Sequence, residues 1–198
     1  FLRLRFSPNI LLDAKRNCTN IQAKSRLFSL AISYINVKGT YKTTEYARNQ
    51  KADRILLNKA IEFSDPILLD IGSSDGLSSL ILIESGNFSR VLLTDRFNKF
   101  YKRKFLFGSI FLDAEGKLLG IKFLIFYIYL STEILIDTSE YAIIETINPL
   151  VEKISGLQEI RFMNIFEKQA GEEVHLIKCS NILNRGYFSA NSIITAVQ

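Results

Sequence analysis

A short glycine-containing loop is the part of the sequence best suited to approach a ligand. It follows an apolar run, residues 67–71, and reads Asp70-Ile71-Gly72-Ser73-Ser74-Asp75-Gly76. Gly72 can make a tight turn and Gly76 lets a following helix begin close to the strand, because glycine lacks a Cβ and tolerates positive φ angles. The main chain of this loop can therefore come close to a bound molecule.

A carboxylate stands roughly 20 residues beyond this loop. It belongs to Asp95, which ends a second apolar run, residues 90–94. Nucleotide-binding strand-helix-strand units place an acid at this spacing, where it accepts hydrogen bonds from two ribose hydroxyls. Asp95 and the adjacent Arg96 are therefore assigned to the same candidate site as the loop. The structural alternative is that Gly72 only turns a corner and Asp95 only ends a strand.

The pattern Asp70-x-Gly72-x-Ser74-x-Gly76 resembles the first motif of class I S-adenosylmethionine-dependent methyltransferases. In that family an acidic residue precedes three alternating glycines, and the middle glycine is often replaced. The resemblance implies a Rossmann-like domain that binds S-adenosylmethionine. It places the loop, including Ser73 and Asp75, beside the methionine part of the cofactor, with Asp70 just before it and Asp95 at the ribose.

Two later segments extend the resemblance. Asn164-Ile165 stands where the family usually has Asp and an apolar residue that read the adenine edge, and an Asn oxygen can also accept from the adenine amino group. The segment Cys179-Ser180-Asn181-Ile182-Leu183 is similar to the post-strand segment of methyltransferases related to those that modify chemotaxis receptors. The resemblance implies that Cys179 and Asn181 lie beside the methionine sulfonium.

The elements that must hold the loop follow from the hydrophobic pattern. Residues 67–71 form a short, almost wholly apolar run, as in a parallel strand buried on both faces, and residues 90–94 predict the next strand. Between them, residues 77–84 predict a helix that ends near Gly86. The sequence therefore predicts one strand-helix-strand crossover, with the loop in its first turn.

Downstream, residues 139–154 predict a helix, and residues 159–163 and 174–179 predict two more strands. We therefore predict an α/β fold. Its core is a Rossmann-like, doubly wound, mostly parallel sheet with helices on both faces and an insertion after the second strand.

Two domains are expected. Residues 1–63 form a helical N-terminal segment, with helices at 20–35 and 44–63, and residues 64–198 form the cofactor-binding domain with insertion 96–138. A complete methyltransferase sheet has seven strands, whereas this chain stops after the fourth. Either the domain is truncated at its C-terminus, or the other segments complete the core, or the last strand is an open edge that a homodimer covers.

The insertion contains three features. Residues 96–105 alternate basic and aromatic side chains, a pattern that suits nucleic acid, anionic lipid or simply a solvated face. Residues 111–119 predict a hairpin that turns at 114–116. Residues 118–136 are strongly apolar, but Lys122 and Glu133 leave too short an uncharged run for a spanning helix. A buried strand or a lid over a site is expected there.

The overall composition limits the partners. The formal net charge is +5, which favours anionic partners such as an anionic acceptor substrate, nucleic acid or an acidic membrane surface. Cys18 and Cys179 belong to no Cys/His cluster, so no disulfide framework or zinc site is indicated and a reducing cytoplasm is predicted.

Together these features predict an S-adenosylmethionine-dependent methyltransferase. Methyl transfer from a sulfonium requires mainly an acceptor held in line with the donor. The chain has a single histidine, His175, which excludes a histidine dyad. Three alternatives stay open: a degenerate binding module without catalysis, a nucleic-acid-binding or nucleic-acid-modifying protein that uses residues 96–105, and a nicotinamide-dependent oxidoreductase. The last is disfavoured because Ser74 replaces the glycine that lets the backbone approach a pyrophosphate.

Overall fold

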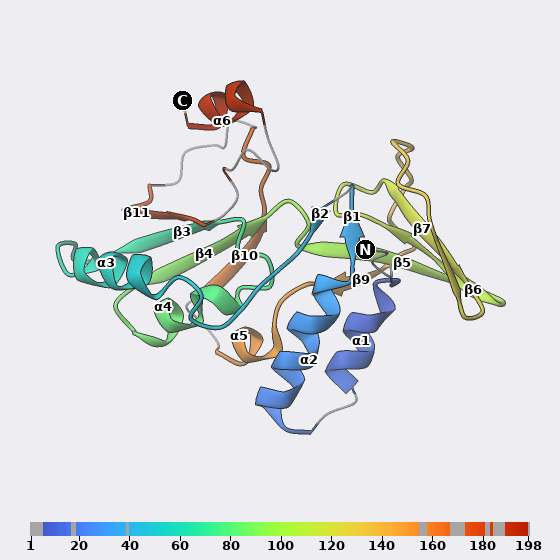
Figure 1. The fold of residues 1–198 in the computed structure, drawn as a ribbon, viewed down its shortest axis with the longest axis horizontal. Coiled ribbons are helices and arrows are strands. Elements are labelled where there is room, and N and C mark those ends of the chain that lie inside the picture. Colours follow the sequence, from blue (N-terminus) through green and yellow to red (C-terminus); the bar gives the residue numbers. More distant parts are fainter. Residues whose placement is uncertain are drawn as a thin grey trace. The chain divides into compact units, whose positions relative to one another are not determined.

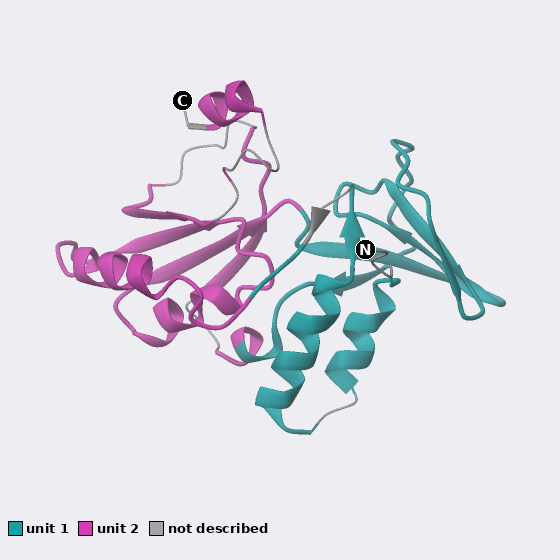
Figure 2. Ribbon diagram, viewed as in Figure 1, with its two compact units in different colours: residues 1–44, 97–150 teal, residues 45–96, 151–198 magenta. Residues whose placement is uncertain are grey.

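The computed structural model describes residues 6–16, 19–38, 40–154, 158–166, 173–180, 183 and 189–197. The chain divides into two compact units (Figure 2), residues 1–44 with 97–150 and residues 45–96 with 151–198. This division differs from the predicted boundary at residue 63. Helix α3 (Gln50–Ala60) packs against two elements of the second unit, α4 (Leu80–Glu84) and β11 (Leu176–Cys179), and so belongs with them.

The first unit is built around a five-stranded antiparallel sheet with the order β8-β7-β6-β5-β9 (Figure 1). Its strands are β5 (Lys99–Phe105), β6 (Gly108–Leu112), β7 (Leu118–Phe123), β8 (Phe126–Tyr129) and β9 (Ala142–Glu145). β5 to β8 follow one another as hairpins, and the predicted turn at 114–116 joins β6 to β7. A separate two-stranded pair consists of β1 (Asn36–Val37) and β2 (Thr40–Tyr41).

Helices α1 (Asn9–Arg16) and α2 (Ile21–Ser33) pack against the five-stranded sheet. Their apolar side chains and those of the strands form one core, with Phe28, Phe100 and Phe111 fully buried in it. Burying one such side chain contributes roughly 1.5–3 kcal/mol relative to leaving it exposed. The sheet and its two helices therefore form a unit with its own hydrophobic core.

The start of α2 offers a test of its capping. The side-chain oxygen of Asn20 accepts hydrogen bonds from the backbone N–H groups of Gln22 and Ala23, at 2.9 and 3.2 Å. Asn20→Ala is expected to lower the free energy of unfolding by about 1 kcal/mol, because two helix-end donors lose their partner. Asn49→Ala is the matched control, since Asn49 precedes α3 without a side-chain capping bond. Urea denaturation measures both variants, and equal losses would contradict this role of Asn20.

The second unit contains a four-stranded parallel sheet with the order β10-β4-β3-β11. The strands are β3 (Ile67–Ile71), β4 (Arg90–Asp95), β10 (Gln158–Phe162) and β11. They match the four predicted strands, but β4 ends one residue later, β10 is shifted by one residue, and β11 begins at Leu176 and not at residue 174. The helix predicted between β3 and β4 is present as a short 3-10 turn, η1 (Leu77–Ser79), followed by α4. Helix α6 (Ala190–Val197) ends the described chain. The fold is therefore mixed α/β with a parallel sheet.

The helix predicted over residues 139–154 is wrong for most of its length. Residues 142–145 form strand β9, which pairs with β5, and only α5 (Pro149–Lys153) is helical. Pro149 explains the break, because a proline disfavours helical backbone in the residue before it while suiting the first turn of a new helix. The side chain of Asn148 then accepts a hydrogen bond from the N–H of Leu150 at 3.0 Å.

The apolar segment 118–136 supplies β7, β8 and the loop after them. The predicted buried strand holds only for Leu119 and Gly120, since most of the later residues are exposed or half-buried. Among the described residues, none of the helices combines the length and the apolar character that crossing a bilayer requires.

Candidate functional site

The carboxyl ends of the four parallel strands lie in register at one edge of the sheet (Figure 1). Ile71 in β3 is aligned with Thr94 in β4 and with Cys179 in β11, and Asp95 in β4 is aligned with Phe162 in β10. The structure therefore brings to one edge the strand ends from which the four predicted site segments begin.

The glycine loop turns sharply against the end of β4. Gly72, Ser74 and Gly76 have φ angles of 73°, 59° and 81°. The N–H groups of Gly72 and Ser73 donate hydrogen bonds to the carbonyl of Thr94, at 2.8 and 3.0 Å. Left-handed backbone costs an ordinary L-residue roughly 1–2 kcal/mol, which explains the two glycines. Ser74 adopts it without being glycine, and strained residues of this kind concentrate at ligand-binding loops.

Asp95 lies directly beside this loop. Its Oδ2 accepts a hydrogen bond from the N–H of Ser74 at 3.0 Å. On the other side of the turn, Oδ1 of the fully buried Asp75 accepts from the N–H of Leu77 at 3.1 Å, where η1 begins. The loop and Asp95 are therefore neighbours, as their spacing in the sequence predicts, while Asp75 holds the turn from inside.

A buried charged cluster adjoins the loop, and none of the sequence motifs predicts it. Nζ of Lys178 in β11 lies 2.9 Å from Oδ1 of Asp53 in α3, and the two side chains are only 1% and 2% exposed. The same Nζ donates to the carbonyl of Ser78 at 3.0 Å and to Oγ of Ser79 at 2.7 Å. Oγ of Ser79 in turn donates to Oδ2 of Asp70 at 2.5 Å. One ammonium group therefore ties together two carboxylates and the first turn after the loop.

The carboxyl group of Asp70 has an altered acidity in this cluster. Burial raises the pKa of Asp70 to about 6, while Lys178 and the hydrogen bond from Ser79 act against that rise. The negative charges of Asp53 and Asp95 raise it further. Because Asp70 is only 1% exposed, its side chain supports the loop from within and reaches a ligand only if the loop opens. A direct role for Asp70 in cofactor binding stays a prediction.

One half of this cluster has a signal in the sequence. Lys178 interrupts an apolar run that predicts a buried strand, and a lysine buried there requires an acidic partner. The identity of the partner has no such signal, since Asp53 is one of 20 acidic residues and comes from a different helix. Ser79 likewise looks like an ordinary helix residue until the fold places it against Asp70.

The segment after β10 also reaches this edge. The N–H of Met163 donates to the carbonyl of Asp95 at 3.3 Å, so the chain continues alongside the end of β4. Oδ1 of Asn164 accepts from the N–H of Phe166 at 3.3 Å, which orders the turn that follows. Asn164 and Ile165 are both half-buried, as is Arg96. Their predicted contacts with a cofactor stay predictions.

Cys179 ends β11 next to β3. The residue is exposed overall, but partial burial of its thiol, together with the charge of Asp70, raises the pKa of Cys179 above its ordinary value. The thiol is therefore held as a neutral group near neutral pH. Asn181, the other predicted residue of this segment, and Cys18 lie outside the described residues.

His175 has a structural role at the start of this strand. Nδ1 of its ring accepts a hydrogen bond from the backbone N–H of Ile67 at 3.2 Å. The backbone N–H of His175 donates to the carbonyl of Ile67 at 3.0 Å. Its ring also packs edge-on against Phe63, with centroids 4.9 Å apart. The histidine therefore lies at the opposite end of the strand from the candidate site.

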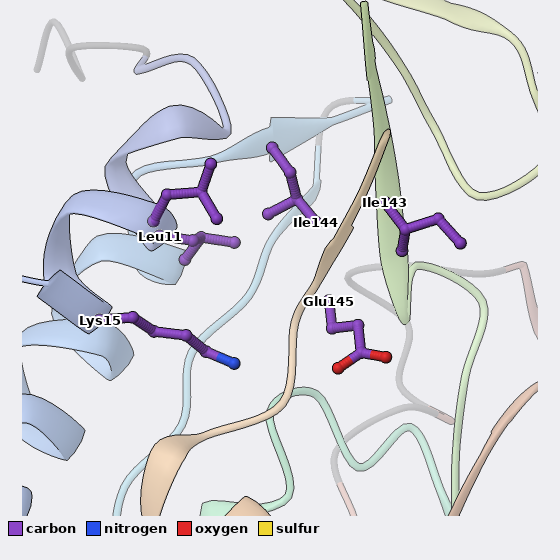
Figure 3. A pocket seen from close by; sticks show the side chains of 6 residues that line it. Leu11, Lys15, Ile143, Ile144 and Glu145 are labelled. Atoms are coloured by element: carbon purple, nitrogen blue, oxygen red, sulfur yellow. The ribbon is translucent and has the colours of Figure 1, made fainter. Parts of the chain in front are cut away.

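The first unit contains a separate pocket of about 230 Å³ between α1 and β9 (Figure 3). It is lined by Leu11, Leu12, Lys15, Ile143, Ile144 and Glu145. None of these residues belongs to the predicted site. Its lining is mostly aliphatic, and Nζ of Lys15 also lies 5.5 Å from the ring centroid of Phe28, which fits a gap at the rim of the hydrophobic core.

No family model, curated protein or solved structure matches this chain. The assignment of a function therefore rests on the geometry of the sheet edge described above.

Proposed function

We propose that the second unit binds S-adenosylmethionine in a Rossmann-like manner and that the protein is a methyltransferase. The observation that carries this proposal is the hydrogen bond between Asp95 and the N–H of Ser74. This bond holds a carboxylate beside a strained glycine loop at the carboxyl end of adjacent parallel strands, where an acid that binds ribose would lie. That is the arrangement that nucleotide-containing cofactors require.

The order of the strands supports the same proposal. Numbered along the chain, the parallel strands lie in the order third, second, first, fourth, which is the first part of the doubly wound order 3-2-1-4-5-6. The order reverses between β3 and β11, and doubly wound sheets bind their ligands outside the carboxyl ends of the strands at that point. The glycine loop follows β3, and Cys179 ends β11, so both border the switch point.

One further atom of the loop fits a polar ligand. Within the described residues, Oγ of Ser74 is buried and has no hydrogen-bond partner. A buried hydroxyl without a partner costs free energy, and a polar group of a bound ligand would satisfy it. The loop, Asp95 and the turn at Asn164 would then hold the methionine part, the ribose and the adenine.

The proposed reaction mainly requires the methyl donor and the acceptor to be held in position. When bound, the cofactor supplies a methyl group on a sulfonium, which is already a good leaving group. The main chain of the loop and the carboxylate of Asp95 would fix the donor at the sheet edge. The neutral thiol of Cys179 would border it without adding a charge, so that an acceptor held in line provides most of the rate.

The test is calorimetric titration with S-adenosylhomocysteine, with NAD as a comparison ligand. Asp95→Ala is expected to weaken S-adenosylhomocysteine binding at least about tenfold, because it removes charge-assisted hydrogen bonds to the ribose. Asp95→Asn keeps an acceptor for the N–H of Ser74 and separates an effect on the loop from an effect on the ligand. Asp137→Ala, at an exposed turn of the first unit, is the matched control.

Three results would speak against the proposal. They are an absence of binding by a folded protein, equal affinity for NAD, or an unchanged affinity in Asp95→Ala. Binding without consumption of S-adenosylmethionine across a panel of acceptors would support the degenerate module in place of the enzyme.

A further inference from the structure

Two neighbouring hairpin turns of the first unit expose large apolar side chains. Leu106 and Phe107 join β5 to β6, and Leu124 and Ile125 join β7 to β8. Leu106 is 86% exposed and Ile125 is 84% exposed. The N–H of Leu124 donates to the carbonyl of Phe107 at 2.9 Å, so the two turns lie side by side. We call these four residues the hairpin-tip surface.

The hairpin-tip surface departs from ordinary turn chemistry. Two-residue hairpin turns normally use Asn, Asp or Gly, which are polar or tolerate positive φ angles. Here both turns consist of large apolar residues, and Leu124 has a φ of 52°, in the left-handed region. The positive φ of Leu124 costs conformational energy, and the apolar turn residues leave apolar surface in contact with water. Phe107 packs edge-on against Phe123, with ring centroids 6.5 Å apart, but Leu106, Leu124 and Ile125 stay mostly exposed, which points to a partner outside the chain.

Lysines stand just behind the apolar turns. Lys104 and Lys122 each precede a turn by two residues, and both are aligned with Ser109, so they lie in one row on one face of the sheet. Neither lysine forms an ion pair with any described residue. The neighbouring Arg103 does form one, with its guanidinium nitrogen 2.7 Å from a carboxylate oxygen of Glu140. The charges of both lysines also act on the nearby Lys102. Its pKa is lowered, chiefly by burial and then by the charges of Lys104 and Lys122. The charge of Asp13 acts in the opposite direction on Lys102, but Lys104 and Lys122 remain a local concentration of positive charge.

We propose that the hairpin-tip surface, with Lys104 and Lys122, docks the protein on an anionic lipid bilayer. A strand rises about 3.4 Å per residue, so these lysines lie about 7 Å behind the tips. Interfacial elements bury their apolar side about 5–10 Å into the boundary between headgroups and acyl chains. Aliphatic tips in the acyl region therefore leave the two ammonium groups at the level of the lipid phosphates.

Two other occupants fit less well. Nucleic acid binds through aromatic faces on which bases stack, and three of the four tip residues are aliphatic. In a symmetric contact between two copies of the tips, Lys104 and Lys122 would face their own counterparts, which repels. The combination of aliphatic tips with an unpaired basic row matches lipid.

The first measurement is cosedimentation with vesicles of phosphatidylcholine, with and without phosphatidylglycerol. Binding is expected only to the anionic vesicles. Leu106→Ser with Ile125→Ser is expected to weaken it by at least about 30-fold, because two large apolar side chains no longer leave water. Lys104→Gln and Lys122→Gln are each expected to weaken it about 5-fold. Ile134→Ser with Leu135→Ser is the matched control, since these residues are also exposed and lie outside the tips.

The second measurement reports the depth of the tips directly. The chain contains no tryptophan, so Phe107→Trp introduces a single indole fluorophore at the tip. Its emission is expected to shift to shorter wavelength on adding anionic vesicles, whereas Leu135→Trp is expected to remain unchanged. Far-UV circular dichroism verifies that every variant folds.

Four results would overturn the proposal. They are an absence of vesicle binding by the folded protein, equal loss of binding in the Ile134/Leu135 control, salt-sensitive binding to single-stranded RNA without vesicle binding, or a dimer that the Leu106/Ile125 variant dissociates without vesicle binding. None of these depends on a cofactor in the second unit, so this proposal and the proposed methyltransferase function succeed or fail separately.

Discussion

Lys178→Met is expected to lower the free energy of unfolding by about 3–5 kcal/mol at pH 7.5, which is the cost of removing one partner of a buried ion pair. Methionine has a similar length and an apolar character, so the substitution removes the charge without a large cavity. Urea denaturation followed by far-UV circular dichroism measures the loss.

The size of this effect follows from the neighbours of Lys178. Asp53 is 1% exposed, and among the described residues neither of its carboxylate oxygens has a hydrogen-bond donor in suitable geometry. The ammonium group 2.9 Å away is therefore the main compensation for its burial. Asp70 also loses a cation that favours its charged form. The variant thus leaves two buried carboxyl groups without a counter-charge.

Lys59→Met is the matched control. Nζ of Lys59 lies 2.7 Å from Glu62, but both side chains are exposed to solvent. Exposed pairs of this kind contribute roughly 0–1 kcal/mol. The double variant Asp53→Asn with Lys178→Met is expected to recover part of the loss, because it removes the orphaned charge. A loss in Lys178→Met no larger than that in Lys59→Met would contradict the role of the cluster.

The pH dependence of stability is expected to change when Asp70 is replaced by asparagine. The pKa of Asp70 rises from 3.8 to about 6 in the folded protein, chiefly because the group is buried. A rise of this size corresponds to about 3 kcal/mol. Asparagine keeps an oxygen that can accept the hydrogen bond from Ser79 but cannot ionise, so Asp70→Asn removes this contribution.

The sign of this pH dependence follows from which state, folded or unfolded, binds the proton of Asp70 more tightly. The folded protein holds the Asp70 proton more tightly than the unfolded chain, so protonation favours folding. The contribution of Asp70 to the free energy of unfolding is therefore greatest below about pH 4. It falls as the pH rises to about 6 and is constant above that value.

The measurement is urea denaturation of Asp70→Asn and the wild type at several values between pH 4 and pH 7.5. Between pH 4 and pH 7.5 the difference between them is expected to move by about 2.5 kcal/mol in favour of the variant, because the remainder of the change lies below pH 4. Asp137→Asn serves as a control, because its effect on the free energy of unfolding is expected to change with pH in the opposite direction. Hydrogen bonds from Ser139 lower the pKa of Asp137, so its contribution is lost as the pH falls. A difference that does not vary with pH would rule out a buried, titrating Asp70.

These two predictions concern the part of the fold that supports the proposed cofactor site. Asp70 is the next-to-last residue of β3, just before the glycine loop, and Ser79 lies in the first turn after it. Lys178 connects both to α3 through Asp53. Variants of the cluster that still fold are therefore expected to affect ligand affinity through the position of the loop, whereas Asp95 variants affect it by contact.

Local patterns in the sequence predict the parallel strands well. The apolar runs before the loop and before Asp95 become β3 and β4 almost residue for residue. The reason is that a strand buried on both faces must be apolar along its whole length, and that a glycine must occupy each turn position where the backbone is left-handed. The expected meeting of the loop and Asp95 follows from the parallel crossover itself.

Helical spacing fails where a proline and a pairing strand compete with it. Residues 142–144 have apolar side chains that suit a helix or a strand, and the neighbouring strand β5 offers backbone partners that only a strand can use. Pro149 then fixes where the helix begins. The sequence also does not predict the division into two units, because α3 joins the parallel sheet only through contacts with distant segments.

The chemistry and the local backbone of the loop follow directly from the amino-acid sequence, since glycine content and apolar runs act over a few residues. The contacts of Lys178 with Asp53 and of Ser79 with Asp70, and the pairing of the two apolar turns, arise from the packing of the folded chain. Each of these pairs joins residues from separate elements, and their contact depends on how the elements pack and on the register of the strands. Side-chain type alone does not encode such contacts, because many acidic, hydroxyl and apolar residues along the chain could equally well have filled those places.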